Sequence, residues 1–157
     1  MKYYFLVLFL LFSGCTYKIT PVIVAFKKDN LAINDQGFLK ENSFSKKIEV
    51  YNVGQLVFVL TINSKNICIN NKCYDKKLFI YKLNPKYPDN LFDLIISHKP
   101  LPNMPLKKIK NGFVQKKGDI IYIVTTDKVL FKDKSNNFLF LLKPLNMENN
   151  KKITKKQ

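Results

Sequence analysis

The chain contains no tryptophan and no arginine, and its 157 residues include only one histidine, three cysteines and five glycines. The glycines are not clustered, so the sequence lacks the Gly-rich loop that cradles phosphate groups. A tetrahedral metal site needs two pairs of Cys or His ligands, and no second pair is available here. We therefore expect no metal ion and no dissociable cofactor.

The sequence also lacks a recognisable catalytic constellation. His98 is the only histidine, and the expected place for it is the end of an amphipathic helix, where it would interact with terminal carbonyls. Ser97 adjoins it, but neighbours on a helix point in different directions and cannot form a Ser–His pair. Asp89 and Asp93 are four apart, although Asp89 is expected to cap the helix. We expect no enzyme activity.

The N-terminus carries an apolar run, Tyr3–Phe12, which follows Lys2. This run is too short to cross a bilayer, because a spanning helix needs roughly 20 apolar residues. It is compatible with an uncleaved anchor, an ordinary secretory signal or a lipoprotein signal. The run ends in Phe12-Ser13-Gly14-Cys15, in which a bulky residue and two small residues precede a cysteine.

This order resembles the lipobox of bacterial lipoproteins, with Phe12 where that family usually has leucine. The resemblance implies a signal peptide at 1–14 and covalent diacylglycerol and acyl (palmitate) groups on Cys15, followed by a lipidated tether at 15–21. Two or three chains, at about 0.8 kcal/mol per buried methylene, hold a protein on a membrane permanently. Thr16, in place of aspartate, implies sorting to the outer membrane of a Gram-negative cell envelope, facing the periplasm. The alternative is a buried or disulfide-bonded cysteine near a cleaved N-terminus.

The formal charge of +16 arises from 27 basic and 11 acidic residues. Such a charge alone suggests nucleic acid as a partner. An exported lipoprotein would instead meet phospholipid headgroups, lipopolysaccharide phosphates or acidic proteins, so we expect no nucleic acid. The alternative is that a Lys-, Asn- and Ile-rich composition reflects AT-rich coding and no specific anionic ligand.

Apart from Cys15, the chain has two cysteines, Cys68 and Cys73, and the segment between them contains Asn70 and Asn71. Asparagine tolerates the positive φ angles of tight turns, so a hairpin can bring the two Cβ atoms to about 3.8 Å. We expect a structural disulfide, which persists outside the cytoplasm. A metal pair and a redox-active pair are the alternatives, although the two-residue spacing of redox motifs is absent.

The mature chain reads as mainly β (α+β), with a single β-rich domain at 22–146 and a disordered basic tail at 147–157. The expected architecture is an antiparallel sheet or incomplete β-barrel with one inserted helix near 89–98. Residues 27–35 are expected to be turn material, 37–47 to be irregular, and 100–105 to form a proline-punctuated loop. Apolar alternation and turn residues predict the following strands: 22–26, 48–52, 56–62, 67–69, 74–80, 112–116, 119–126, 128–132 and 138–143.

The order of strands Ile48–Ile62, the segment Tyr87–Leu101 and the strands from Gly112 resembles the lipoprotein-sorting carriers of the Lol system, in particular the outer-membrane receptor. That resemblance implies an incomplete barrel that holds acyl chains under a helical lid. The function expected from it is binding of lipid or lipoprotein acyl chains. Candidate cavity residues are apolar strand residues, with ordinary core packing as the alternative: Phe58, Leu60, Ile121, Ile123, Phe138 and Phe140. The competing function is a non-catalytic scaffold that contacts envelope proteins.

Overall fold

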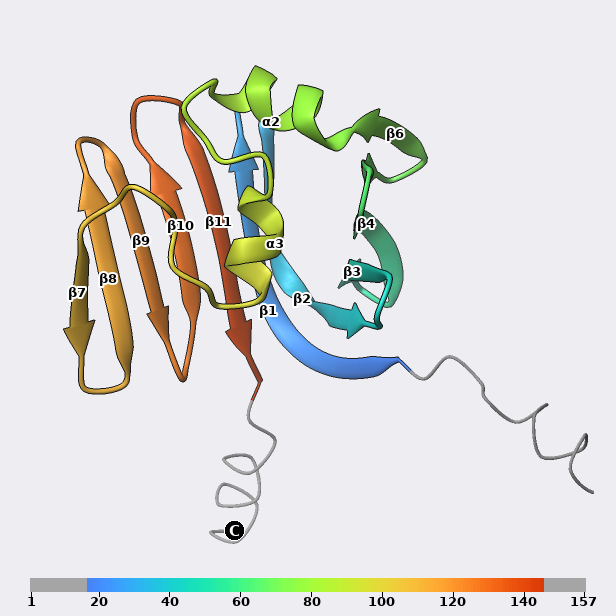
Figure 1. Cartoon of the computed structure of the whole chain (residues 1–157). Helices are drawn as coiled ribbons and strands as arrows, with labels where there is room; N and C mark the ends of the chain where they lie inside the picture. The colour runs from blue at the N-terminus through green and yellow to red at the C-terminus, as the bar shows by residue number, and fades with distance from the viewer. Residues whose placement is uncertain (1–16, 146–157) are drawn as a thin grey trace, which may run out of the picture.

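The structure is a computed structural model of the whole chain, and it describes residues 17–145 (Figure 1). The expected signal peptide at 1–14, Cys15 and the expected tail at 147–157 lie outside the described residues. Lys18–Pro21 already belong to a strand, so regular structure begins within the segment expected to be a tether.

The described residues form eleven strands and two short helices, and the mainly β prediction is confirmed. In chain order the elements are β1 (Lys18–Lys28), β2 (Leu31–Glu41), β3 (Ser45–Asn52), β4 (Gln55–Asn63), β5 (Asn66–Ile69), β6 (Lys72–Asp75), α2 (Lys76–Leu83), α3 (Leu91–Ile96), β7 (Leu106–Ile109), β8 (Gly112–Lys117), β9 (Ile120–Thr125), β10 (Val129–Asp133) and β11 (Phe138–Pro144).

All strands belong to one antiparallel sheet in the order β6-β5-β4-β3-β2-β1-β11-β10-β9-β8-β7. Strand β1 pairs with β11 as well as with β2, so the two ends of the domain meet in the middle of the sheet. The sheet is open, because its edge strands β6 and β7 do not pair with each other. Figure 1 shows β7–β11 as a flat wall and β1–β5 curving around α3. We refer to the whole eleven-stranded sheet as the half-barrel.

One face of the half-barrel is buried and carries the core. In β1, Val22, Val24 and Phe26 are buried while the residues between them are partly exposed, which is the two-residue period of a strand. The same alternation buries Phe138 and Phe140 in β11. These side chains lie on the concave face, where α3 covers them (Figure 1).

The helical segments differ from the sequence prediction. Residues 76–83 form α2 where a strand over 74–80 was expected. The Asp75 carboxylate accepts a hydrogen bond from the Leu78 N–H (3.0 Å), and this cap stabilises the helix start. Helix α3 is shorter than expected, and Asn90, not Asp89, occupies its N-cap position, without a side-chain cap bond.

Two strands, β2 and β7, were not expected from the sequence. Strand β2 lies across the segments predicted to be turn material and irregular, and β7 directly follows the predicted loop at 100–105. Strand β3, which was expected from residue 48, already begins at Ser45. Gly37 begins the segment predicted to be irregular, but it is a strand residue of β2. In the sheet, a Cβ at Gly37 would overlap the Glu49 carbonyl oxygen, so glycine is what allows β2 and β3 to pair closely.

Candidate functional site

Four of the six candidate cavity residues lie together in the core of the half-barrel. Phe58, Leu60, Phe138 and Phe140 are almost fully buried. The ring of Phe26 lies between them, with ring-centre distances of 5.5 Å to Phe58 and 5.7 Å to Phe138. These side chains therefore line the concave face, where they are packed against one another.

Ile121 and Ile123 are on the opposite, outer face of the sheet. Their neighbour Tyr122 pairs with Phe131, whose side chain is buried in the core. Successive side chains alternate between the two faces of a strand, so the two isoleucines point away from the core. They do not meet the other four candidates.

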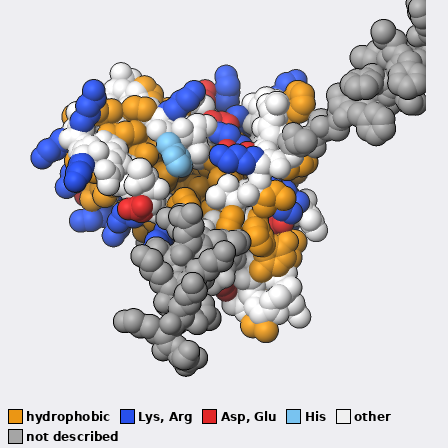
Figure 2. Space-filling model, turned by 90° about the horizontal axis from the view of Figure 1, so that it is seen from below, with side chains coloured by type: hydrophobic (Ala, Val, Ile, Leu, Met, Phe, Trp, Pro, Cys, Tyr) orange, Lys and Arg blue, Asp and Glu red, His pale blue; other side chains and the backbone are white. Residues whose placement is uncertain are grey.

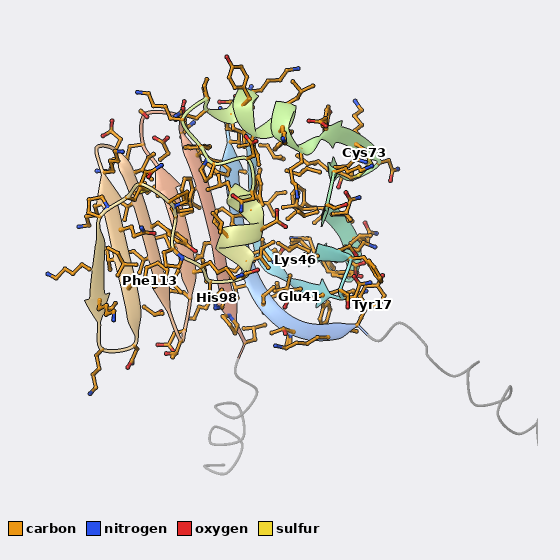
Figure 3. The ribbon with its side chains drawn as sticks, viewed as in Figure 1. Tyr17, Glu41, Lys46, Cys73, His98 and Phe113 are labelled. Atoms are coloured by element: carbon orange, nitrogen blue, oxygen red, sulfur yellow. A yellow bond between two sulfur atoms is a disulfide. The ribbon has the colours of Figure 1, made fainter. Side chains whose placement is uncertain are left out.

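Helix α3 fills the space in front of the concave face with aromatic contacts. The ring of Phe92 lies 6.2 Å from Phe138 and 5.7 Å from Phe140. Just before the helix, the ring of Tyr87 lies 5.4 Å from Phe131. Figure 3 shows side chains between α3 and the strands behind it. The concave face is thus closed by α3 in this structure.

A hollow of about 660 Å³ lies beside α3, where three loops meet the ends of β8, β9 and β10. This volume falls within the roughly 300–1,000 Å³ typical of small-molecule sites. The hollow is lined by residues of the loops at 84–88 and 101–104, of the 117–120 turn and of β10: Asn84, Lys86, Tyr87, Pro88, Leu91, Leu101, Pro102, Asn103, Met104, Lys117, Gly118, Asp119, Ile120, Phe131, Asp133 and Ser135. None of the six residues predicted from the sequence lines it.

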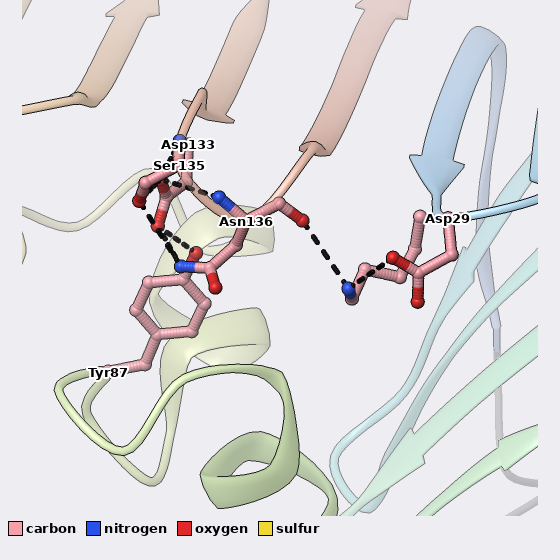
Figure 4. Close-up of polar contacts among 6 residues, drawn as sticks. Asp29, Tyr87, Asp133, Ser135 and Asn136 are labelled. Atoms are coloured by element: carbon pink, nitrogen blue, oxygen red, sulfur yellow. Dashed lines mark hydrogen bonds and ion pairs between the residues drawn. The ribbon is translucent and has the colours of Figure 1, made fainter.

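Asp133 is buried at the wall of this hollow and accepts several hydrogen bonds (Figure 4). Its carboxylate accepts from the Tyr87 hydroxyl (2.6 Å), the Ser135 hydroxyl (2.6 Å) and the Asn136 amide (2.7 Å). Burial opposes ionisation of Asp133, but these hydrogen bonds outweigh it and lower the pKa to about 2. Burial and the bond to Asp133 raise the pKa of Tyr87, so its hydroxyl remains a donor.

Two buried polar side chains tie the covering segments to the sheet. Gln115 on β8 accepts from the Leu101 N–H (2.7 Å) and donates to the carbonyls of Leu101 and Met104 (both 3.0 Å). The Tyr122 hydroxyl on β9 donates to the Lys99 carbonyl just after α3 (3.1 Å). Together they fix the loop after α3 beside the hollow.

The exposed side of α3 is held by lysines from the curved half of the sheet and from α2. Lys76 forms an ion pair with Asp93 at 3.0 Å. Lys46 of β3 donates to the Ser97 hydroxyl and to the Asp93 carbonyl. Ser97 is therefore engaged by a lysine. The backbone N–H of His98 donates to the Ile95 carbonyl (3.1 Å).

The disulfide prediction is confirmed: Cys68 and Cys73 are bonded. They face each other across the β5–β6 hairpin, in which Asn70 has a positive φ of 52°. This hairpin forms the edge of the sheet, so the disulfide fixes that edge and does not take part in the hollow.

Among residues 17–145, no cluster of three or more His, Cys, Asp and Glu side chains is arranged to hold a metal ion. Over the same part of the chain, no helix combines the length and the apolar character needed to span a membrane. No protein-family model matches the chain, and no curated protein matches it.

Proposed function

We propose that this protein is an envelope lipoprotein, anchored by lipids on Cys15, whose half-barrel binds an acyl chain of a lipid or lipoprotein. The observation that carries the proposal is the hollow beside α3, next to an aromatic concave face. The chain would enter at the hollow and lie along the face that α3 covers.

The chemistry of the lining favours an acyl chain over a polar ligand. Met104 and Ile120 offer partly exposed apolar surface to the hollow, and Leu91, Leu101 and Phe131 belong to its lining but are buried. Burying apolar surface of the ligand against them gives roughly 25 cal/mol per Å². The polar wall is already satisfied, since the Asp133 carboxylate has its donors within the protein.

Lysines at the hollow complement an anionic headgroup. Lys86 and Lys117 both belong to its lining and are exposed. A carboxylate or phosphate at the end of the acyl chain would lie between water and these ammonium groups. The ligand class is therefore an amphiphile with one anionic end.

A longer chain requires α3 to move away from the sheet. The helix has six residues, and the ring of its Phe92 packs against Phe138 and Phe140. An acyl chain that replaced Phe92 at this place would keep the two phenylalanines out of water, so the exchange would leave the buried apolar area of the sheet nearly unchanged. Phe138 and Phe140 would then contact the ligand, as the sequence prediction proposed.

Binding of cis-parinaric acid, a fluorescent fatty acid, to residues 16–157 tests the acyl site. Ile120→Trp places a larger side chain at a partly exposed position in the lining of the hollow and should abolish the fluorescence increase. Palmitate should displace the probe from the unchanged protein. Tyr81→Trp, on the exposed side of α2, is the matched control and should bind normally. Equal binding by both variants would place the ligand elsewhere.

The anchor is tested separately by Cys15→Ala, which should move the protein from the membrane fraction to the soluble fraction. Unchanged fractionation would count against lipidation of Cys15. Fractionation does not depend on the hollow, so the two halves of the proposal can fail independently.

A second candidate function, a scaffold that acts through protein contacts, is favoured by the outer face of the sheet. Its register aligns a row of partly exposed apolar side chains across five strands: Val114, Ile123, Leu130, Leu141 and Ala25. A photo-crosslinker at position 123 that captured one envelope protein, while one at position 81 did not, would favour this function.

A further inference from the structure

The end of the half-barrel at which β1 begins exposes large apolar side chains among lysines. Tyr17 is 51% exposed, Ile19 55% and Phe44 74%. We name this region the tether-side surface and define it by Tyr17, Lys18, Ile19 and Phe44. Figure 3 labels Tyr17, Glu41 and Lys46 at this end of the molecule.

Phe44 is held outward by an ordered turn. The Asn42 side-chain oxygen accepts hydrogen bonds from the Phe44 N–H (2.9 Å) and the Ser45 N–H (2.7 Å). The Asn42 N–H in turn donates to the Ser45 carbonyl (3.0 Å). The turn is fixed by its own hydrogen bonds, so the exposed ring is a defined feature of the surface.

Strand pairing places this turn beside the N-terminal end of the described chain. Lys18 pairs with Glu41, and Glu41 pairs with Lys46 across the next strand. Cys15 precedes Lys18 by three positions, which span at most about 10 Å of extended chain. A lipid on Cys15 would therefore keep the tether-side surface close to the bilayer.

The charges at this end suit an anionic surface. The buried carboxylate of Glu49 is neutralised by Lys40 (2.7 Å) and Lys47 (2.8 Å). Lys18 is exposed near the turn, so its ammonium group is available, whereas Lys46 is hydrogen-bonded to Ser97 and to the Asp93 carbonyl. Figure 2 shows lysine and hydrophobic side chains together around the start of the described chain. Basic residues beside aromatic ones are typical of membrane-surface contacts.

We propose that the tether-side surface lies on the anionic phospholipid bilayer that holds the Cys15 lipids. Tyr17, Ile19 and Phe44 enter the headgroup region, and Lys18 lies beside lipid phosphates. This orientation rests on the proposed anchor at Cys15 but not on the acyl site. It would hold the half-barrel in one pose, so that the hollow keeps a fixed position above the membrane.

Two other exposed apolar sites offer matched comparisons. Val53 is 96% exposed at the opposite end of β3 from Phe44, roughly 25 Å away along an eight-residue strand. Tyr81 is 62% exposed on α2, at the other end of the half-barrel in Figure 1. If exposure of an apolar side chain were sufficient, positions 44, 53 and 81 would contact the membrane equally. If proximity to the anchor decides, only position 44 contacts it.

The test uses the full-length lipidated protein in vesicles of phosphatidylcholine and phosphatidylglycerol. A nitroxide is attached at Phe44→Cys, Val53→Cys or Tyr81→Cys under non-reducing conditions, and its relaxation by oxygen and by a water-soluble nickel chelate is compared. We expect the ratio of oxygen to nickel accessibility to be several-fold higher at position 44 than at 53 or 81. The difference should shrink when the vesicles contain phosphatidylcholine alone.

Equal ratios at positions 44 and 81 in vesicle-bound protein would overturn the orientation and leave the anchor intact. A higher ratio at position 53 would place the opposite end of β3 on the membrane and contradict the proposal. Equal immersion in charged and uncharged vesicles would refute the role of Lys18. Protein that fails to float with vesicles would refute both the anchor and the orientation, while failure of fatty-acid binding alone would affect neither.

Discussion

The side chain of Gln115 bonds both the N–H and the carbonyl of Leu101, at 2.7 Å and 3.0 Å. Its amide also donates to the Met104 carbonyl, so one buried residue of β8 fixes the loop that follows α3. Three backbone polar groups of that loop thereby have a hydrogen-bond partner within the protein. The loop forms one wall of the hollow, so Gln115 links the stability of the sheet to the shape of the proposed site.

Gln115→Leu should lower the free energy of unfolding by about 2–4 kcal/mol, because it leaves buried backbone groups of the loop without partners. Urea unfolding of residues 16–157 measures the effect. Gln55→Leu makes the same change at an exposed position and should alter stability by less than about 0.5 kcal/mol. A similar small effect at both positions would show that the loop does not depend on Gln115.

Asp133 should make stability depend on acid pH. Its folded pKa of about 2 lies below the ordinary value of 3.8, so its stabilisation is complete above about pH 4 and is lost as the pH falls toward 2. The shift corresponds to about 2 kcal/mol. Between pH 5 and pH 2, the free energy of unfolding measured with urea should therefore fall less steeply for Asp133→Asn than for the unchanged protein.

Glu49, whose pKa is also lowered to about 2, contributes in the same direction and remains present in the Asp133→Asn variant. Burial opposes its ionisation, and the hydrogen-bonded Lys40, Lys47 and Tyr51 outweigh that cost. The control Asp127→Asn removes an exposed carboxylate and should leave the pH profile unchanged. Identical profiles for the two variants would refute the role assigned to Asp133.

The Cys68–Cys73 disulfide should stabilise the edge hairpin by about 2–3 kcal/mol, mainly by restricting the unfolded chain. Cys68→Ser combined with Cys73→Ser should lower the melting temperature, as should reduction of the unchanged protein. The double variant serves as the control for reduction, because reductant should not change its melting temperature further. An unchanged melting temperature of the normal protein on reduction would contradict the structural role.

Val53→Asn should stabilise the β3–β4 hairpin by about 0.5–1 kcal/mol, because asparagine adopts left-handed backbone angles more readily than a β-branched residue. Val53 has a φ of 47° and Gly54 a φ of 78°. Urea unfolding is again the measurement. Val57→Asn, in the adjoining strand, should give no gain, and equal gains at both positions would show that the backbone angle of Val53 is not the cause.

Residue periodicity predicted the strands best where one strand carries a long apolar run. Leu56–Ile62 was expected as a strand and lies within β4. The same reasoning assigned the segment after Cys73 to a strand, although Asp75 is a helix cap whose partner Leu78 is three residues away. Local hydrogen bonding outweighed the apolar pattern at that point.

When a strand is apolar on both sides, the sequence does not show which side faces the core. In β9, Ile121 and Ile123 are as apolar as Tyr122, and only pairing with Phe131 decides that Tyr122 faces the core. The hollow could not be predicted for a related reason. Its walls come from three separate loops, and Tyr87 reaches Asp133 across 46 positions of sequence.

The most direct test of the acyl-chain proposal is native mass spectrometry of residues 16–157 purified from a bacterial periplasm. We expect a co-purifying acyl lipid of defined mass that is lost in Phe58→Asp, which introduces a charge on the concave face, and in the milder Ile120→Trp, at a partly exposed position in the lining of the hollow. Tyr81→Trp should retain the lipid. A ligand-free mass for the unchanged protein, together with no binding of added palmitate, would contradict the proposal.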